Sequence, residues 1–112
     1  MIFEIRDYHY RPELFDAYKT WADEAVPVLK DKLDLVGFWI DEGIAPEVLG
    51  SNPDDPEIGR ANVTWIIRWE SKAVRDEEFP KVIASDEWQA VWAKHPDPNG
   101  YIQMLGRFMT AM

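Results

Sequence analysis

The first ten residues alternate in a way that predicts a β-strand from Ile2 to Tyr10. Side chains of a strand point alternately to its two faces, so one face carries Phe3 and Ile5. The other face is mixed and carries Ile2, Glu4, Arg6, Tyr8 and Tyr10. We expect the Phe3 face to pack beneath helices and the mixed face to look into the interior of a dimer. A charged pair survives in such an interior only when it is hydrogen-bonded or hydrated.

A pattern of apolar residues with the spacing of a helix follows this strand. Apolar residues recur three and four positions apart from Leu14 to Leu29, with polar residues between them, which is typical of an amphipathic helix. Pro12 suits the first turn of this helix, where its missing N–H costs nothing. Pro27 lies inside the helix, so we expect a kink or a break near residues 24–26.

Two short segments are apolar on both faces. Residues 35–40 (LVGFWI) and 62–70 (NVTWIIRWE) therefore predict buried strands, which we interpret as hairpin partners. The stretch between them, residues 41–61, is rich in Pro and Gly and contains six acidic residues and one basic residue. A connection of this length predicts a lid, an arm or a packed surface loop.

The last third of the chain predicts two helices and a strand. Ser71 is a plausible N-cap of a helix that Pro80 interrupts. A second helix starts at Ser85 or Asp86 and has an inner stripe of Trp88, Val91, Trp92 and His95. A strand follows over residues 101–110. The resulting order predicts an α+β fold: a ferredoxin-like βαββαβ arrangement with an antiparallel four-stranded sheet and helices on one face.

Helices on one face leave the other face of the sheet uncovered. Each predicted strand carries large apolar side chains on both faces, and a soluble monomer rarely exposes more than a few hundred Å² of contiguous apolar surface. We therefore expect a homodimer in which two sheets pack face to face and form a dimeric α/β barrel.

Composition narrows the classes of partner. A chain of 112 residues fits one domain, residues 1–112. The net charge of −9 argues against nucleic acid and against anionic membrane surfaces as partners. The chain has no cysteine, no secretory signal and no apolar run long enough for a membrane span, so we expect a cytoplasmic protein.

Four sequence blocks together resemble the NIPSNAP family, a branch of the dimeric α/β-barrel superfamily. They are Met1–Tyr8, Leu35–Trp39, Trp69–Glu77 with Ser71 and Arg75 in register, and Ser85–Trp88. A Pro-containing first helix between the first two blocks adds to the resemblance. The resemblance implies the fold and a dimer. It implies no defined reaction, and some relatives are linked to vesicle traffic or mitochondrial signalling.

The chain departs from this family at two places. The connector of residues 41–61 is longer than we expect for the family, and Trp65 stands where many relatives carry a His. Any role tied to that His does not transfer to this chain.

Six residues form a candidate ligand site: Glu4, Arg6, Tyr8, Trp39, Trp65 and Trp69. Arg6 would anchor a carboxylate or enolate oxygen, Tyr8 would donate a hydrogen bond, and the indole rings would form an apolar wall. The alternative is structural: a Glu4–Arg6 pair that satisfies itself at an interface, with the Trp rings as core.

The two histidines are weaker candidates. His9 could act as a base near neutral pH, but it shares the face of Phe3 and Ile5, so we expect it at the strand end. The position of His95 at a helix C-terminus is explained by the favourable interaction of its side chain with the negative end of the helix dipole. Two distant histidines and no cysteine give no metal site, and the sequence indicates no cofactor.

Three functions remain open. We favour a homodimer that binds a small organic ligand, anionic or aromatic, in the barrel interior. The second is a cofactor-free oxygenase or isomerase acting on an enolisable or phenolic compound, as in other branches of the superfamily. The third is an adaptor whose working surface is the acidic connector. An open interior lined by Arg6 and Tyr8 favours binding or catalysis, and a filled interior favours the adaptor.

Overall fold

A computed structural model describes residues 1–112. The elements are β1 (Ile2–Tyr10), α1 (Phe15–Lys32), β2 (Leu35–Ile40), β3 (Val63–Trp69), α2 (Lys72–Ile83), α3 (Asp86–Trp92) and β4 (Tyr101–Met109). Short 3-10 turns at Pro12–Leu14 and Pro98–Gly100 precede α1 and β4. None of the helices combines the length and the apolar character that crossing a membrane requires.

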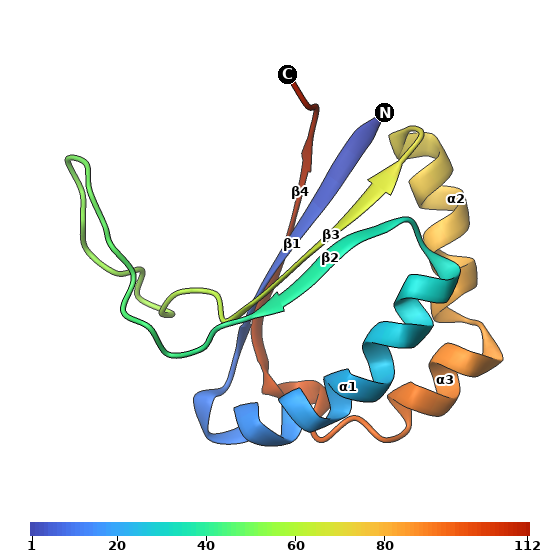
Figure 1. The fold of residues 1–112 in the computed structure, drawn as a ribbon, viewed down its shortest axis with the longest axis horizontal. Helices are drawn as coiled ribbons and strands as arrows, with labels where there is room; N and C mark the ends of the chain where they lie inside the picture. Colours follow the sequence, from blue (N-terminus) through green and yellow to red (C-terminus); the bar gives the residue numbers. More distant parts are fainter.

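The four strands form one antiparallel sheet in the order β2-β3-β1-β4. All three helices lie on one side of this sheet (Figure 1). The predicted fold class, an α+β ferredoxin-like chain with an antiparallel four-stranded sheet, is confirmed. Strand β1 is central, so its side chains meet both neighbouring strands.

Both helix-internal prolines are tolerated. The helix α1 continues without a break through Pro27, and α2 continues past Pro80 to Ile83, so the predicted interruption of α2 is wrong. A proline removes the hydrogen bond to the carbonyl four residues earlier. Those carbonyls belong to Asp23 and Asp76, which are exposed, so water can replace the lost donor.

The expected assignment of the β1 faces is wrong. Strands β1 and β3 pair so that Glu4 lies opposite Ile67, Arg6 opposite Trp65, and Tyr8 opposite Val63. Directly opposed residues share a face of the sheet, and these β3 residues are buried on the side that the helices cover. The mixed face of β1 therefore packs beneath the helices. Burying its tyrosine rings favours this arrangement, and Arg75 of α2 supplies a second cation for Glu4.

The helix-free face of the sheet mixes apolar and polar side chains. Trp39 is 50% exposed there, opposite Thr64 of β3. Asp7 accepts a hydrogen bond from the Thr64 hydroxyl at 2.6 Å and pairs with Arg107 at 3.3 Å. This face therefore carries both exposed apolar side chains and charged side chains.

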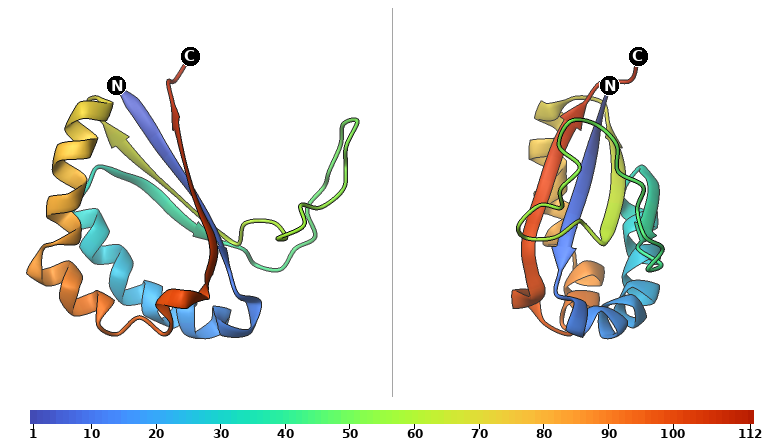
Figure 2. Two further views of the ribbon diagram at one scale, coloured as in Figure 1. Left: turned by 180° about the vertical axis from the view of Figure 1, so that it is seen from behind. Right: turned by 90° about the vertical axis from the view of Figure 1, so that its left-hand side faces the viewer.

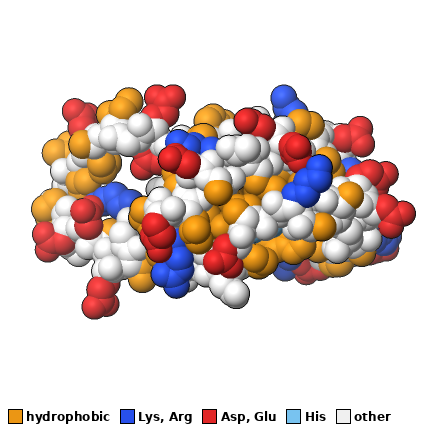
Figure 3. All heavy atoms as spheres, turned by 90° about the horizontal axis from the view of Figure 1, so that it is seen from below, with side chains coloured by type: hydrophobic (Ala, Val, Ile, Leu, Met, Phe, Trp, Pro, Cys, Tyr) orange, Lys and Arg blue, Asp and Glu red, His pale blue; other side chains and the backbone are white.

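Residues 41–62, the connector between β2 and β3, form an arm. The arm stands away from the sheet on the side opposite the helices (Figures 1 and 2). The amide of Asp41 donates to the carbonyl of Asn62 at 2.9 Å and closes its root. Acidic and hydrophobic side chains lie next to one another on it (Figure 3), and Leu49 is 93% exposed. Of the three alternatives for this connector, the structure shows an arm.

Candidate functional site

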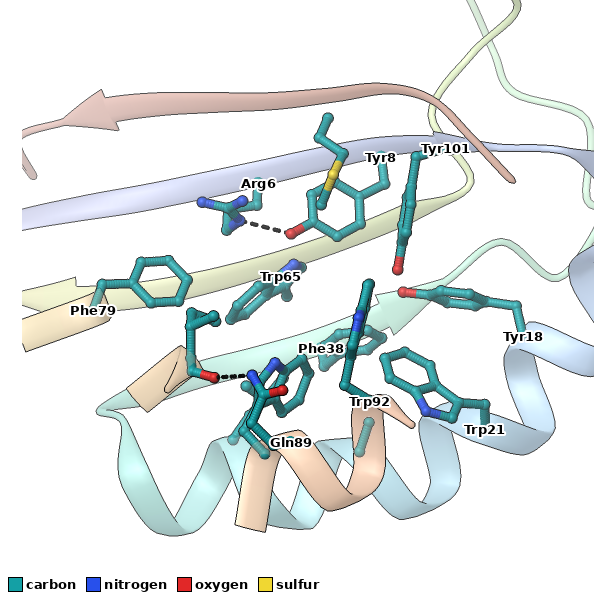
Figure 4. A pocket seen from close by; sticks show the side chains of 15 residues that line it. Arg6, Tyr8, Tyr18, Trp21, Phe38, Trp65, Phe79, Gln89, Trp92 and Tyr101 are labelled. Atoms are coloured by element: carbon teal, nitrogen blue, oxygen red, sulfur yellow. Dashed lines mark hydrogen bonds between the residues drawn. The ribbon is translucent and has the colours of Figure 1, made fainter. Parts of the chain in front are cut away.

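A cavity of about 300 Å³ lies between the covered face of the sheet and the three helices. Fifteen residues line it, and thirteen of them are hydrophobic (Figure 4). Four indole rings and three tyrosines dominate the wall: Trp21, Trp65, Trp88, Trp92, Tyr8, Tyr18 and Tyr101. No aspartate or glutamate is among the lining residues.

The helical wall follows from residue spacing. In α1, Tyr18, Trp21 and Ala25 recur at positions that share one face, and all three are buried. Trp88 and Trp92 of α3 pack edge-on against Trp21, with ring centroids 6.0 and 5.9 Å away. The Trp21 indole N–H also donates to the Val91 carbonyl at 2.8 Å. These contacts fix α1 against α3 and set the distance between the helices and the sheet.

Glu4 lies behind the wall and holds it in place. Its side chain is fully buried, and its carboxylate accepts from Arg6 at 2.6 Å, from Arg75 at 2.8 and 3.1 Å, and from the Trp69 indole at 3.0 Å. Burial by itself would raise the pKa of Glu4. The hydrogen bonds from Arg75 and the attraction of Arg6 outweigh it, so the pKa lies below its usual value, and Glu4 is an anion at neutral pH.

Arg6 supplies the one guanidinium of the cavity wall. Its Nη1 binds Glu4, and its Nε donates to the Tyr8 hydroxyl at 2.7 Å. Glu4 is shared between two guanidinium groups, so one carboxylate faces two cations. The group keeps unused N–H donors, because a guanidinium has five.

Tyr8 is held as a neutral donor. Burial raises its pKa, although Arg6 opposes the shift, so the phenol keeps its proton at neutral pH. Because the oxygen of Tyr8 accepts from Arg6, its own proton is free to bind another acceptor. Arg6 and Tyr8 together form a polar pair in an aromatic wall (Figure 4).

His95 lies beside Tyr101 at the other end of the cavity. Its Nε2 lies 2.8 Å from the Tyr101 hydroxyl, and the Asp97 amide donates to its Nδ1 at 3.1 Å. Burial lowers the pKa of His95, although Asp97 partly opposes the shift. The sequence-based interpretation of His95 as a partner of the helix dipole did not predict this environment. The residue follows α3 and is buried against Trp21 and Trp92.

The six predicted site residues separate into three groups. Arg6, Tyr8 and Trp65 line the cavity. Glu4 and Trp69 lie behind it and bind each other. Trp39 lies on the helix-free face, because a register shift between Leu35 and Gly37 places its neighbour Phe38 opposite Trp65. The site was expected in a dimer interior, and the cavity instead lies between the sheet and the helices of one chain.

The aromatic residues of the helices were missed as lining residues. Their spacing was interpreted as ordinary core, and nothing in a single helix distinguishes a packed stripe from a cavity wall. His9 lies at the end of β1, outside this cavity, and its Nδ1 has no hydrogen-bond partner. No group of three or more histidine, aspartate or glutamate side chains comes together in a way that could hold a metal ion.

Comparisons with known proteins agree on the fold. No family model matches the sequence, and no curated protein matches it. A NIPSNAP family protein with unknown function from Agrobacterium tumefaciens is 22% identical, with 97% of this chain and 86% of that chain covered and a TM-score of 0.68. An uncharacterised NIPSNAP domain protein from Burkholderia xenovorans is 16% identical, with 100% and 95% covered and a TM-score of 0.68.

A third similar structure is an antibiotic biosynthesis monooxygenase, which is 15% identical, with 100% and 99% covered and a TM-score of 0.60. Identities this low establish the fold and not the activity. The resemblance inferred from the four sequence blocks is thus confirmed in three dimensions, and the chain shares the fold of NIPSNAP family proteins.

Proposed function

We propose that this protein is a NIPSNAP-like homodimer that binds a small aromatic ligand in the cavity between its sheet and its helices. The observation that carries this proposal is an aromatic cavity with a hydrogen-bonded polar pair, Arg6 and Tyr8, on its wall. That pair suits a carboxylate, enolate or carbonyl oxygen of the ligand.

The size and lining of the cavity support a ligand site. Small-molecule sites have volumes of roughly 300–1,000 Å³ and mainly apolar walls with a few polar groups. A cavity of about 300 Å³ lies at the lower end of this range, which fits a compound of two or three fused rings.

The helix-free face supports a second copy of this chain as the partner. Trp39, Leu105 and Met109 are 50%, 41% and 47% exposed, and Phe3 and Ile5 are only partly covered. The same face carries both signs of charge, with Asp7 beside Arg107. A surface that carries both apolar and oppositely charged groups can pair with itself about a two-fold axis.

A cofactor-free oxygenase is the second candidate. Arg6 and Tyr8 would stabilise the negative oxygen of an enolate or phenolate, and the fold is shared with an antibiotic biosynthesis monooxygenase. Such chemistry also needs a base, and the cavity wall has no carboxylate. Both nitrogens of His95 are engaged. Binding is therefore the simpler proposal, and consumption of 1-naphthol under air without added cofactor would favour the oxygenase instead.

Calorimetric titration with 2-naphthoate tests the binding proposal. We expect saturable binding to the unmodified protein and at least tenfold weaker binding to the Arg6→Gln variant, because hydrogen bonds to charged groups contribute about 1.5–3 kcal/mol. Arg68→Gln is the matched control, since Arg68 is an exposed guanidinium paired with Asp34. No binding, or equal losses in the two variants, would refute a site at Arg6.

A further inference from the structure

The hydrogen-bond partners of His95 fix the position of its proton. A backbone N–H can only donate, so the amide of Asp97 requires a lone pair on the Nδ1 of His95, 3.1 Å away. A neutral imidazole has one proton, which must then be on Nε2. The tautomer follows from the network of hydrogen bonds.

The imidazole is also held in its neutral form. A second proton could only be placed on Nδ1, where it would face the Asp97 amide. Burial between the rings of Trp21 and Trp92, 4.4 and 4.5 Å away between centroids, lowers the pKa of His95 further.

The turn that carries Asp97 is itself anchored. The Tyr10 hydroxyl donates to the Asp97 carbonyl at 2.9 Å. A side chain at Gly100 would come within 2.5 Å of the Tyr10 ring, so glycine allows this close approach. The amide that sets the His95 tautomer is therefore held by contacts from β1.

The protons at this end of the cavity can be counted. The Nε2 of His95 donates to the Tyr101 oxygen at 2.8 Å, and the Tyr18 hydroxyl faces the Tyr101 hydroxyl (Figure 4). The Tyr101 oxygen accepts the imidazole proton, so the Tyr101 hydroxyl keeps its own proton for another acceptor. Tyr101 lines the cavity, so this proton is available to a ligand. With the opposite tautomer, the Tyr101 hydroxyl would donate to Nε2 of His95 and would have no proton to offer.

We propose that His95 is a positioning residue that makes the Tyr101 hydroxyl a hydrogen-bond donor to the ligand. The ligand would then be an aromatic compound that carries a carbonyl or phenolate oxygen, such as an aryl ketone or a quinone. This inference rests on the proposed ligand-binding function and extends it to the end of the cavity opposite Arg6.

The rest of the wall agrees with a ligand that accepts hydrogen bonds. The proton of Tyr8 is free because its oxygen accepts from Arg6. The only side-chain amide, Gln89, donates to the Ile83 carbonyl, and no carboxylate faces the cavity. A cationic amine would find no counter-charge there.

The tautomer is tested directly by long-range proton–nitrogen NMR of the imidazole in the unmodified protein. We expect the His95 signals of a neutral ring with a protonated Nε2 and an unprotonated Nδ1 at pH 7.5. A protonated Nδ1 would overturn the inference, because the Tyr101 hydroxyl would then donate its proton to Nε2 of His95.

A matched ligand pair tests the donor. The probes are 2-acetylnaphthalene, which has a carbonyl acceptor, and 2-isopropylnaphthalene, which has a similar shape and no acceptor. We expect the ketone to bind about threefold to tenfold more tightly, as one neutral hydrogen bond contributes. Its C=O stretching band should move to lower frequency when it is bound.

Variants assign this preference to Tyr101 and His95. Tyr101→Phe should lose the preference and the band shift. His95→Gln, whose amide can donate from a similar position, should keep both, and His95→Leu should weaken both. Circular dichroism and thermal unfolding show whether each variant is folded.

The outcomes separate this inference from the proposed function. If both probes bind equally, or if His95→Leu keeps the full preference, the donor assignment is overturned and ligand binding stands. If neither probe binds the unmodified protein while 2-naphthoate does, the donor assignment is again overturned. If none of the three compounds binds, the proposed function fails, and the inference fails with it.

Discussion

Glu4 is the residue on which the covered face of β1 depends. It is the one acidic side chain that is completely buried, and a buried carboxylate is tolerated only when its hydrogen bonds are satisfied. Two guanidinium groups and one indole satisfy it. The same contacts hold Arg6 in the cavity wall, so Glu4 links the stability of the fold to the geometry of the site.

Substituting Glu4 by glutamine should therefore lower the free energy of unfolding by about 3 kcal/mol, the cost of breaking a buried ion pair. The exposed pair between Asp34 and Arg68 provides the control, and Asp34→Asn should cost less than about 1 kcal/mol. Urea unfolding of both variants measures the difference. Similar small losses would mean that the buried network does not hold the fold.

His95 should make stability depend on pH. Its folded pKa lies below the ordinary value of 6.5 because of burial, so the unfolded chain binds more protons below that pH. The neutral ring of His95 therefore contributes its full stabilisation above about pH 6.5. This stabilisation declines as the pH falls toward the pKa that His95 has in the folded protein. The groups that face the ring are Asp97, Tyr10, Tyr18 and Tyr101, and the phenols stay neutral in this range.

Urea unfolding between pH 7.5 and pH 5 measures this dependence. The His95→Gln variant should show a shallower decline than the unmodified protein, because glutamine does not titrate. Parallel declines in the two proteins would show that His95 is not responsible.

At the scale of the elements, periodicity was sufficient to predict their order and the fold class. It could not predict which face of β1 is covered, because the second cation of Glu4 comes from Arg75, 71 residues later. It could not place Trp39 either, since the register shift in β2 reverses the alternation. The interruption expected at Pro80 was wrong because the surroundings of the affected carbonyl depend on tertiary structure.

The arm should be dispensable for folding. Residues 42–61 can be replaced by Asn-Gly, which leaves Asp41 opposite Asn62 across a two-residue hairpin turn. Shortening a flexible loop lowers the entropic cost of closing it, so the free energy of unfolding should stay the same or rise by up to about 2 kcal/mol.

Thermal and urea unfolding of the shortened chain test this prediction. A loss of stability greater than about 1 kcal/mol would show that the arm supports the fold. The surface hollow that Pro12, Phe15 and Ile58 line together would be the place where it does so.

At the scale of the whole molecule, the sequence singled out Arg6 and Tyr8 but assigned them to a dimer interior, whereas both line a cavity between the sheet and the helices of one chain. The cavity needs side chains from β1, β2, β3, β4 and all three helices, and no single element reveals that they enclose a space. The helix-free face and the cavity are on opposite sides of one sheet, so assembly and ligand binding can be tested separately.

The proposed homodimer predicts that a charge placed on the helix-free face separates the subunits. Trp39→Lys should convert a dimer into a folded 13 kDa monomer in light-scattering measurements at micromolar concentration. Leu49→Lys, on the tip region of the arm, is the control and should leave the assembly unchanged. A monomeric unmodified protein, or a Trp39→Lys variant that stays dimeric, would contradict the assembly.

The six tryptophans provide the most direct test of the central claim, that the ligand site lies between the sheet and the helices. Trp21, Trp65, Trp88 and Trp92 line the cavity, and Trp39 lies on the opposite face. When 2-naphthoate is titrated into the nitrogen-15-labelled protein, the indole N–H signals of these four should shift and that of Trp39 should not. A shift of Trp39 alone, with the four cavity signals unchanged, would contradict the claim.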